Sequence, residues 1–359
     1  MSSPAESTRL ASVDAFRGLT VAAMLLVNNA GDWGHVYAPL EHADWHGCTP
    51  TDLVFPFFLF IVGVSLALSL GPRIDSNGDR GALTRTVLVR ALRIVVLGLV
   101  LHAVAFWLIG SRSAYRPFGV LQRIGLCFAV AGLFAVHTKP RMQWLAFFGI
   151  LLGYWALLLW GGDLTKEGNL ASRIDTLLLG PHAYEFDAKT GLGHEPEGLL
   201  STVPAIATTL FGVRAGDWLR RHQRNRLWQA GLAALLAGWV WSIVFPFNKQ
   251  LWTSSYVLWS GGFAMLALFA AHVAVDERGA PPIGRSFGVN AIAAYAGSWL
   301  MVCVLAGFHL GGPIYRTGFA WMTPSTGPYV ASLAYAIAFV AIWWAIVAVL
   351  DRKKIHFKI

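Results

Sequence analysis

Long apolar runs separated by short polar stretches dominate this chain. Each run has about 20 residues, the length that a helix needs to cross a hydrocarbon core about 30 Å thick. A backbone exposed to lipid must satisfy its own hydrogen bonds, so such runs are expected to be helices. We predict about ten spans, over residues 12–30, 51–71, 86–109, 118–137, 142–160, 199–217, 227–246, 253–274, 288–309 and 328–350.

Composition supports the same fold class. Hydrophobic residues make up 56% of the chain and charged residues 13%, about half the roughly 25% that is usual for soluble domains. The spans leave no segment for a separate soluble domain. We therefore expect residues 1–359 to form a single all-α transmembrane domain, with about ten helices around a polar cavity.

The positive charge of the chain follows the predicted topology. The net charge is +9, and most of the 28 Lys and Arg residues fall on one side when the loops alternate across the membrane. The positive-inside rule then places both termini in the cytoplasm. This distribution excludes nucleic acid as the partner and predicts a multi-pass protein of a bacterial inner membrane, in contact with the lipid bilayer. The opening residues lack a cleavage site after an apolar core, so the first span is expected to remain as an anchor.

Two long polar loops lie on the predicted outer side, at about 31–50 and about 161–198. Loops of this length between membrane helices are commonly functional. The second loop is acidic and ends with Glu195 and Glu197. An acidic outer surface suits a cationic substrate such as an amino sugar, and an ordinary solvated loop is equally compatible with it.

The first loop holds the strongest candidate for chemistry, His42. A neutral imidazole can accept a proton from a nucleophile or carry an acyl group. Asn28, at the outer end of the first span, can orient the imidazole or hold a developing oxyanion. Asp44, Trp45 and Asp52 surround His42 in the sequence and are candidate substrate-binding residues.

A metal site is the alternative for the same loop. His42 and His46 have metal-compatible i, i+4 spacing if this stretch is helical. The spacing recurs by chance and the chain has no HExxH motif. We expect no metal.

Polar residues also interrupt or border several apolar spans. Such residues usually face a shared polar cavity, and the alternative is hydrogen bonding that holds helices together. Asp14 and Arg17 are three residues apart on one helical face and can pair. Together with the basic inner loops, which can attract a phosphate-rich cofactor, the following residues are candidates for cofactor binding: Arg17, Gln122, Arg123, Trp252, Ser254 and Asn290.

Seven segments, in order along the whole chain, are similar to the heparan-α-glucosaminide N-acetyltransferase family of membrane acyltransferases. They include SVDAFRGLTVAAMLLVNN (12–29), EHADWHGCTPTDLVFPFFLFIVGVSLALS (41–69), EPEGLLSTVPAIATTLFGVRAG (195–216) and NKQLWTSSYVLWSGG (248–262). The family has a catalytic histidine in a His-x-x-Trp-x-Gly setting, which His42 to Gly47 matches. Its partner asparagine lies in a Val-Asn pair, which Val27-Asn28 matches. His46 stands where the family pattern has asparagine.

The resemblance implies an acetyltransferase that moves an acetyl group from acetyl-CoA to the amine of glucosamine or a related amino sugar. His42 would act as general base or as acyl carrier, and the sequence does not separate these roles. A homodimer is also expected, without an assigned interface. A multi-span transporter of sugars or small anions is the alternative function, since it too would have a polar cavity.

Overall fold

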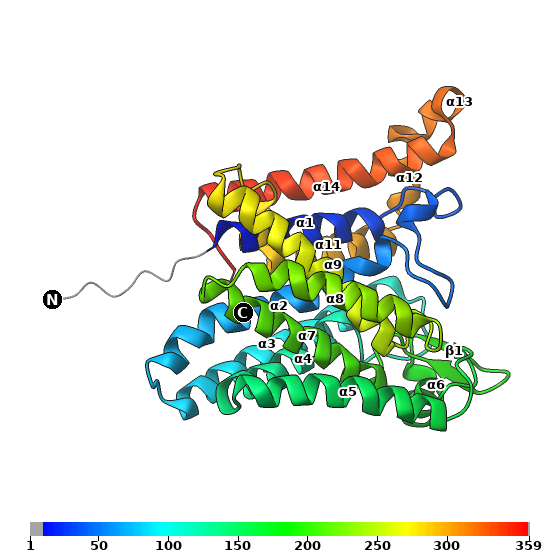
Figure 1. Ribbon diagram of the computed structural model, residues 1–359. Coiled ribbons are helices and arrows are strands. Elements are labelled where there is room, and N and C mark those ends of the chain that lie inside the picture. Colours follow the sequence, from blue (N-terminus) through cyan, green and yellow to red (C-terminus); the bar gives the residue numbers. More distant parts are fainter. Residues whose placement is uncertain (1–9, 358–359) are drawn as a thin grey trace.

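The computed structural model describes residues 10–357, and long helices dominate this part of the chain (Figure 1). Every predicted span coincides with a helix of 17 residues or more. These helices are α1 (Ala11–Val27), α2 (Val54–Asp75), α3 (Arg80–Ile109), α4 (Val120–His137), α5 (Pro140–Trp160), α7 (Leu199–Arg220), α8 (Asn225–Ser242), α9 (Ser254–Ala271), α11 (Ala291–Gly307) and α14 (Pro328–Arg352).

Shorter elements occupy the connections. The loop before α7 folds into a helix and a hairpin in which Glu185 pairs with His194. The shorter elements are α6 (Leu170–Leu179), β1 (Glu185–Asp187), β2 (Leu192–His194), α10 (Arg285–Val289), α12 (Gly311–Gly318), α13 (Thr323–Thr326), the single turns η1 (Ala38–Leu40), η2 (Thr51–Leu53), η3 (Gly180–His182) and η5 (Ala320–Met322), and the π-helical η4 (His272–Glu277).

Seven helices among the described residues are long and apolar enough to cross a membrane, and up to eight if a bent pair counts as one span. The bent pair joins α11 to the segment Gly311–Thr326 at 92°. The other predicted spans are shorter or less apolar: α1 and α11 have 17 residues each, about 26 Å of helix, and α8 is less apolar than α2. The prediction of an all-α multi-pass membrane protein is confirmed.

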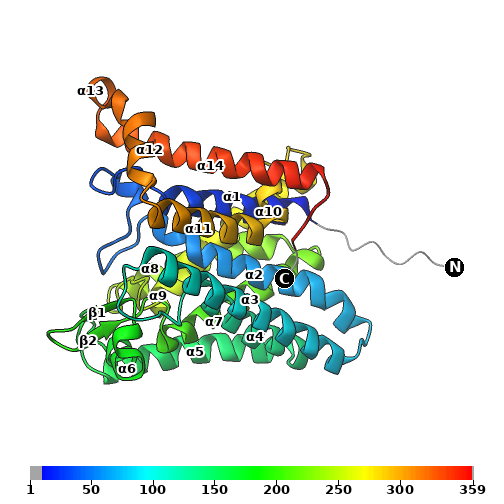
Figure 2. The same cartoon turned by 180° about the vertical axis from the view of Figure 1, so that it is seen from behind.

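The two ends of the helix bundle differ. α1 begins and α14 ends at one end, whereas the loop after α1, the hairpin β1–β2, α6 and α12–α13 gather at the other (Figures 1 and 2). We call this second end the loop end. The two long loops that were predicted on one side of the membrane therefore lie at the same end of the molecule.

α7 forms the centre of the bundle, with 78% of its most apolar window buried, compared with 17% for α3. It packs closely along α2 because both helices carry glycines at the crossing. A Cβ atom on Gly63 would lie 2.0 Å from the carbonyl oxygen of Thr209, and one on Gly212 would lie 2.0 Å from that of Phe60. The two backbones thus touch directly, which only residues without side chains allow.

Candidate active site

A cavity of about 440 Å³ lies at the loop end of the bundle. We call it the first cavity. It collects residues from α1, the loop before α2, the hairpin, the turn before α7, the turn before α9, and α11. Candidate residues that line it are Asn28, His42, Trp45, Asp52, Arg123, Glu197 and Trp252. Most of the predicted catalytic and substrate-binding residues are therefore brought together.

Asp52 orients His42. Its Oδ1 lies 2.7 Å from Nδ1 of His42, while Oδ2 accepts from the backbone N–H groups of Ala43 (3.1 Å) and Thr49 (3.0 Å). The Asp52 carboxylate is fully buried and sits in the single turn before α2, where a helix N-terminus favours negative charge. The carboxylate fixes Nδ1 as the protonated nitrogen, and Nε2 is left with the lone pair that can take a proton.

Lys249 belongs to the candidate site by its position, and the sequence analysis missed it. Its Nζ lies 3.0 Å from Nδ1 and 3.2 Å from Nε2 of His42, and 3.6 Å from Oδ1 of Asp52. Burial lowers the pKa of Lys249, against the opposing effects of Asp52 and Glu197. Its charge had counted only toward topology, although it stands inside a segment quoted for the family resemblance.

The turn that carries Lys249 is tightly built. Oδ1 of the buried Asn248 accepts from Leu251 N at 2.8 Å, and Thr253 N donates to the Asn248 carbonyl at 3.1 Å. Trp252 has a left-handed backbone, φ 54°, and its buried indole donates to Thr208 on α7 at 3.0 Å. A bulky residue with positive φ is strained, so surrounding contacts must hold this turn in place.

Asn28 caps the C-terminus of α1, where its backbone N–H donates to Met24 at 3.2 Å. Its side chain is exposed to the first cavity and forms no hydrogen bond with His42 or any other described residue. The amide is thus available to a ligand rather than tied to the imidazole.

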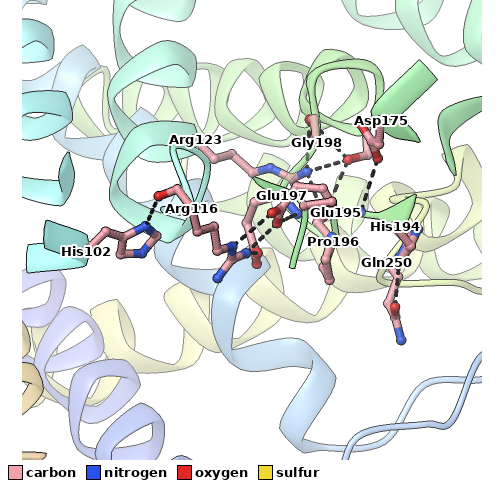
Figure 3. Close-up of polar contacts among 12 residues, drawn as sticks. His102, Arg116, Arg123, Asp175, His194, Glu195, Pro196, Glu197, Gly198 and Gln250 are labelled. Carbon is pink, nitrogen blue, oxygen red and sulfur yellow. Dashed lines mark hydrogen bonds and ion pairs between the residues drawn. The ribbon is translucent and has the colours of Figure 1, made fainter. Parts of the chain in front are cut away.

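A buried ion cluster forms another wall of the first cavity (Figure 3). Nε of Arg116 donates to Glu195 at 2.9 Å, and its Nη2 contacts both Glu195 and Glu197, the latter at 2.6 Å. Burial alone would raise the pKa of Glu197, but the charges of Arg116, Arg123 and Lys249 outweigh it and hold the pKa below its ordinary value. Glu197 lines the cavity and Glu195 lies behind it.

Arg123 holds the turn before α7. Its Nη2 donates to the Pro196 carbonyl at 2.8 Å and contacts Ser201, and its Nε donates to Thr202 at 3.2 Å. The guanidinium also lies 5.2 Å from the ring centroid of Trp252. It connects the start of α4 to the wall that carries Glu197.

The second long loop, at about residues 161–198, closes over the first, at about residues 31–50. The Trp45 indole donates to the Leu164 carbonyl at 2.7 Å, and its ring lies edge-on to His194 with centroids 5.3 Å apart. His194 bonds Ser172 through Nδ1 (2.8 Å) and Gln250 through Nε2 (2.9 Å). Burial lowers the pKa of His194 to about 4, so the imidazole is neutral at pH 7. Trp45 is therefore fixed by the neighbouring loop.

A second cavity of about 790 Å³ adjoins the first, with which it shares the lining residues Met24, Phe55, Val120 and Tyr295. Its walls are mostly apolar. Arginines from α1 and the first half of α3 also line it, namely Arg17, Arg85, Arg90 and Arg93. Arg17 pairs with Asp14 at 3.1 Å, as predicted, and donates to Ser65 on α2 at 2.7 Å.

Several predicted residues lie outside both cavities. Gln122 and Asn290 are buried, and their side-chain amides have no partner among the described residues. Ser254 is buried and donates to the Leu151 carbonyl at 2.7 Å. Asp44 is exposed, and its carbonyl accepts from Gln250 at 3.4 Å. Their roles in binding stay predictions.

The structure does not support the spacing argument for a metal. Residues 41–47 are not helical, so His42 and His46 do not share a helical face. Glu41 lies in extended backbone and Gly47 has φ 124°, which breaks any regular helix between them. Within residues 10–357 no group of three His, Cys, Asp or Glu side chains is arranged to hold a metal ion.

Fold and site together define a polytopic α-helical membrane protein with a His–Asp pair in a cavity at one end of the bundle. Residues 9–243 match the family model described as heparan-alpha-glucosaminide N-acetyltransferase, catalytic. The heparan-alpha-glucosaminide N-acetyltransferases of Homo sapiens and Mus musculus are 30% and 29% identical to this chain over 98% of its length. The chain spans about three fifths of their length, 60% and 61%. It belongs to the heparan-α-glucosaminide N-acetyltransferase family.

Proposed function

We propose that this protein transfers an acetyl group from acetyl-CoA to the amine of glucosamine or a related amino sugar. The observation that carries the proposal is the position of His42, which lines the first cavity with Nδ1 bound to the buried carboxylate of Asp52. An imidazole held in this way presents Nε2 as a base. The family relationship supplies the reaction class.

The residues suit each step of an acyl transfer. Nε2 of His42 removes a proton from the sugar ammonium, and the neutral amine attacks the thioester carbonyl. The C–N bond forms, the C–S bond breaks, and the CoA thiolate leaves with the proton that His42 returns, while the nitrogen loses its second proton to solvent. The Asn28 amide and the Lys249 ammonium are two groups in the cavity that can stabilise negative charge on the carbonyl oxygen.

The carboxylate of Glu197 is the counterpart for the positive charge of the acceptor. It lines the same cavity as His42, and its depressed pKa keeps it ionised at pH 7. Trp45 offers an apolar face to a sugar ring and is held in place by Leu164 and His194. In this arrangement the ammonium of the acceptor lies between the carboxylate of Glu197 and Nε2 of His42.

Acetyl-CoA would reach His42 through the second cavity. The arginines that line this cavity match a phosphate-rich nucleotide, its apolar wall matches the pantetheine arm, and the shared residues Phe55 and Tyr295 bring the two cavities together. The proposal places the loop end outside and both termini in the cytoplasm of a bacterial inner membrane, with the helices α1, α8 and α11 completing ten crossings. The positive-inside distribution supports this orientation.

The test is acetyl transfer by purified protein from labelled acetyl-CoA to glucosamine, with His42→Ala and His46→Ala beside the wild type. We expect labelled N-acetylglucosamine from the wild type and from His46→Ala, and none from His42→Ala. Activity in His42→Ala would move the catalytic role elsewhere. Protein that binds no acetyl-CoA and transports the sugar instead would overturn the proposal in favour of a transporter.

One measurement distinguishes direct acetyl transfer from a mechanism with an acetyl-His42 intermediate. Wild-type protein mixed with labelled acetyl-CoA and no acceptor stays unlabelled if transfer is direct, which is the route we propose. Label retained on His42, and discharged when glucosamine is added, would show instead that the imidazole carries the acyl group.

A further inference from the structure

A side chamber of about 180 Å³ adjoins the first cavity, with which it shares Arg116, Tyr184 and Trp299. It lies between the end of α3, the segment that follows it, and α11. Its remaining walls are His102, Ala105, Phe106, Ile109, Ser111 and Arg112. None of the lining residues is acidic, and none of them lines the second cavity.

The two arginines of this chamber differ in their ion-pair partners. Arg116 is neutralised by Glu195 and Glu197 behind the shared wall (Figure 3). Arg112 forms no ion pair with any described residue. Its guanidinium lies 4.8 Å from the ring centroid of Tyr184, and its Nη1 has a long contact, 3.4 Å, with the Ala183 carbonyl. The positive charge of Arg112 is therefore available to a ligand.

Trp299 supplies a second unsatisfied donor. Its indole Nε1–H is buried and has no acceptor among the described residues. The ring is held by stacking on His102, with centroids 5.7 Å apart at 29°, and His102 in turn donates from Nδ1 to the Arg116 carbonyl at 2.8 Å. A buried donor without an acceptor is costly, and a ligand oxygen would satisfy it.

We propose that this chamber binds an anionic group, a carboxylate, phosphate ester or sulfate ester, of the acceptor. The inference rests on the proposed function and names the class of its acceptor: an amino sugar that carries a negative charge. Arg112 binds the anion, Trp299 donates to one of its oxygens, and the ammonium lies beside Glu197 and His42 in the first cavity. Opposite charges on either side of the shared wall fix the orientation of such a dipolar substrate.

The side chamber is separate from the proposed binding place of the acetyl-CoA phosphates, which is the second cavity. The second cavity, with its own arginines, shares no lining residue with the chamber. Changes at Arg112 should therefore act on the acceptor and leave the KM for acetyl-CoA unchanged.

The experiment compares acceptors that differ in charge. Four acceptors are assayed: glucosamine, glucosamine 6-phosphate, glucosamine 6-sulfate and muramic acid. Each is tested with the wild type, Arg112→Gln, Arg112→Lys and Trp299→Phe. We expect kcat/KM for at least one anionic acceptor to exceed that for glucosamine by about 10–100-fold, the value of one charged hydrogen bond. Arg112→Gln should bring this ratio close to one, and Arg112→Lys should keep most of it.

Arg316→Gln is the matched control, because it removes an arginine from α12, at the same end of the molecule, without touching the chamber. It should leave the ratio unchanged. Should Arg112→Gln not fold, Trp299→Phe removes the indole N–H together with part of the ring and keeps Arg112 in place. The ratio should then fall by a smaller factor.

Different results separate this inference from the proposed function. Acetylation of glucosamine with no preference for any anionic acceptor would overturn the inference alone, as would a preference that survives in Arg112→Gln. Inhibition by inorganic phosphate and sulfate to the same extent in the wild type and Arg112→Gln would also count against it. Acetylation of none of the four acceptors would overturn the proposed function and this inference with it.

Discussion

The ammonium of Lys249 lies 3.0 Å and 3.2 Å from the two ring nitrogens of His42, although 207 residues separate them along the chain. With Nδ1 bound to Asp52, the lone pair of Nε2 is the acceptor that remains for this cation. The proposed base is therefore covered by a donor in the ligand-free protein. Arrival of a thioester would give Lys249 another partner, its carbonyl oxygen, and would uncover Nε2.

Lys249→Met removes this cation. We expect kcat to fall by about 100-fold, as for loss of one oxyanion donor, with little change in the KM for acetyl-CoA. Burial lowers the pKa of Lys249, so the wild type should lose activity at alkaline pH below the value of 10.5 that is usual for lysine. In Lys249→Arg this loss should move to higher pH, because guanidinium stays protonated. A pH–rate profile of Lys249→Arg that matches the wild type would contradict a role for the ammonium.

Asp52→Asn tests the orientation of His42. The amide removes the charge that fixes the tautomer. Its NH2 group either opposes the backbone N–H groups of Ala43 and Thr49, donor against donor, or donates to Nδ1 of His42 and favours the tautomer with the proton on Nε2. We expect kcat to fall by about 100-fold or more, measured with labelled acetyl-CoA. Asp187→Asn, at the exposed hairpin turn, should keep wild-type kcat. Equal rates for Asp52→Asn and the wild type would remove Asp52 from the mechanism.

Arg116→Met removes the ion-pair partner of the buried carboxylate of Glu195 and of the half-buried carboxylate of Glu197. Loss of one partner of a buried ion pair typically costs about 3–5 kcal/mol, so the melting temperature in detergent should fall clearly. The double variant Arg116→Met, Glu195→Gln should recover part of that loss, because fewer charges stay uncompensated. A double variant less stable than the single one would show that Glu195 contributes through other contacts.

His194 makes the packing of the second long loop against Trp45 sensitive to acid. Its pKa is lowered from 6.5 to about 4 by burial, so between these values the unfolded chain binds a proton that the folded chain does not. Stability from this residue is therefore present above about pH 6.5 and is lost as the pH falls toward 4. His194→Gln should weaken the pH dependence of thermal unfolding in this range. An unchanged pH dependence would argue that the loop opens before His194 is protonated.

Asp175, in the same loop, has the opposite effect on how stability depends on pH. Burial raises its pKa from 3.8 to about 7, and it accepts from the backbone N–H of Glu195 at 3.3 Å. The folded chain keeps a proton that the unfolded chain loses, so its contribution falls as the pH rises from about 4 to 7. Asp175→Asn should raise the melting temperature at pH 8 and have little effect near pH 4. Destabilisation at pH 8 would show that the ionised carboxylate is needed.

The helices could be predicted from hydropathy, and much of the site could not. Apolar runs long enough for a bilayer coincide with helices throughout, because a lipid-exposed backbone has few alternatives. Asp52 was predicted to bind substrate, and its contact with His42 was not predicted. Its partner is set by the tight turn from Thr49 to Asp52, which composition does not reveal.

Long-range contacts account for the other omissions. Lys249 and Arg116 are ordinary outer-loop cations in the sequence, and only tertiary folding shows that one faces His42 and the other two glutamates. Conversely, Ser254 was predicted for its polarity beside an apolar span. Its hydroxyl donates to the Leu151 carbonyl inside the bundle, which is the helix-pairing role that polar side chains often have in membranes.

The glycine contact between α2 and α7 has a mechanical consequence. Asp52 stands just before one of these helices and Glu197 just before the other, so their spacing is set by two backbones in direct contact rather than by flexible side chains. We expect the two helices to move as one rigid unit. A thicker or thinner bilayer would then tilt both helices together and leave the separation of the two carboxylates unchanged.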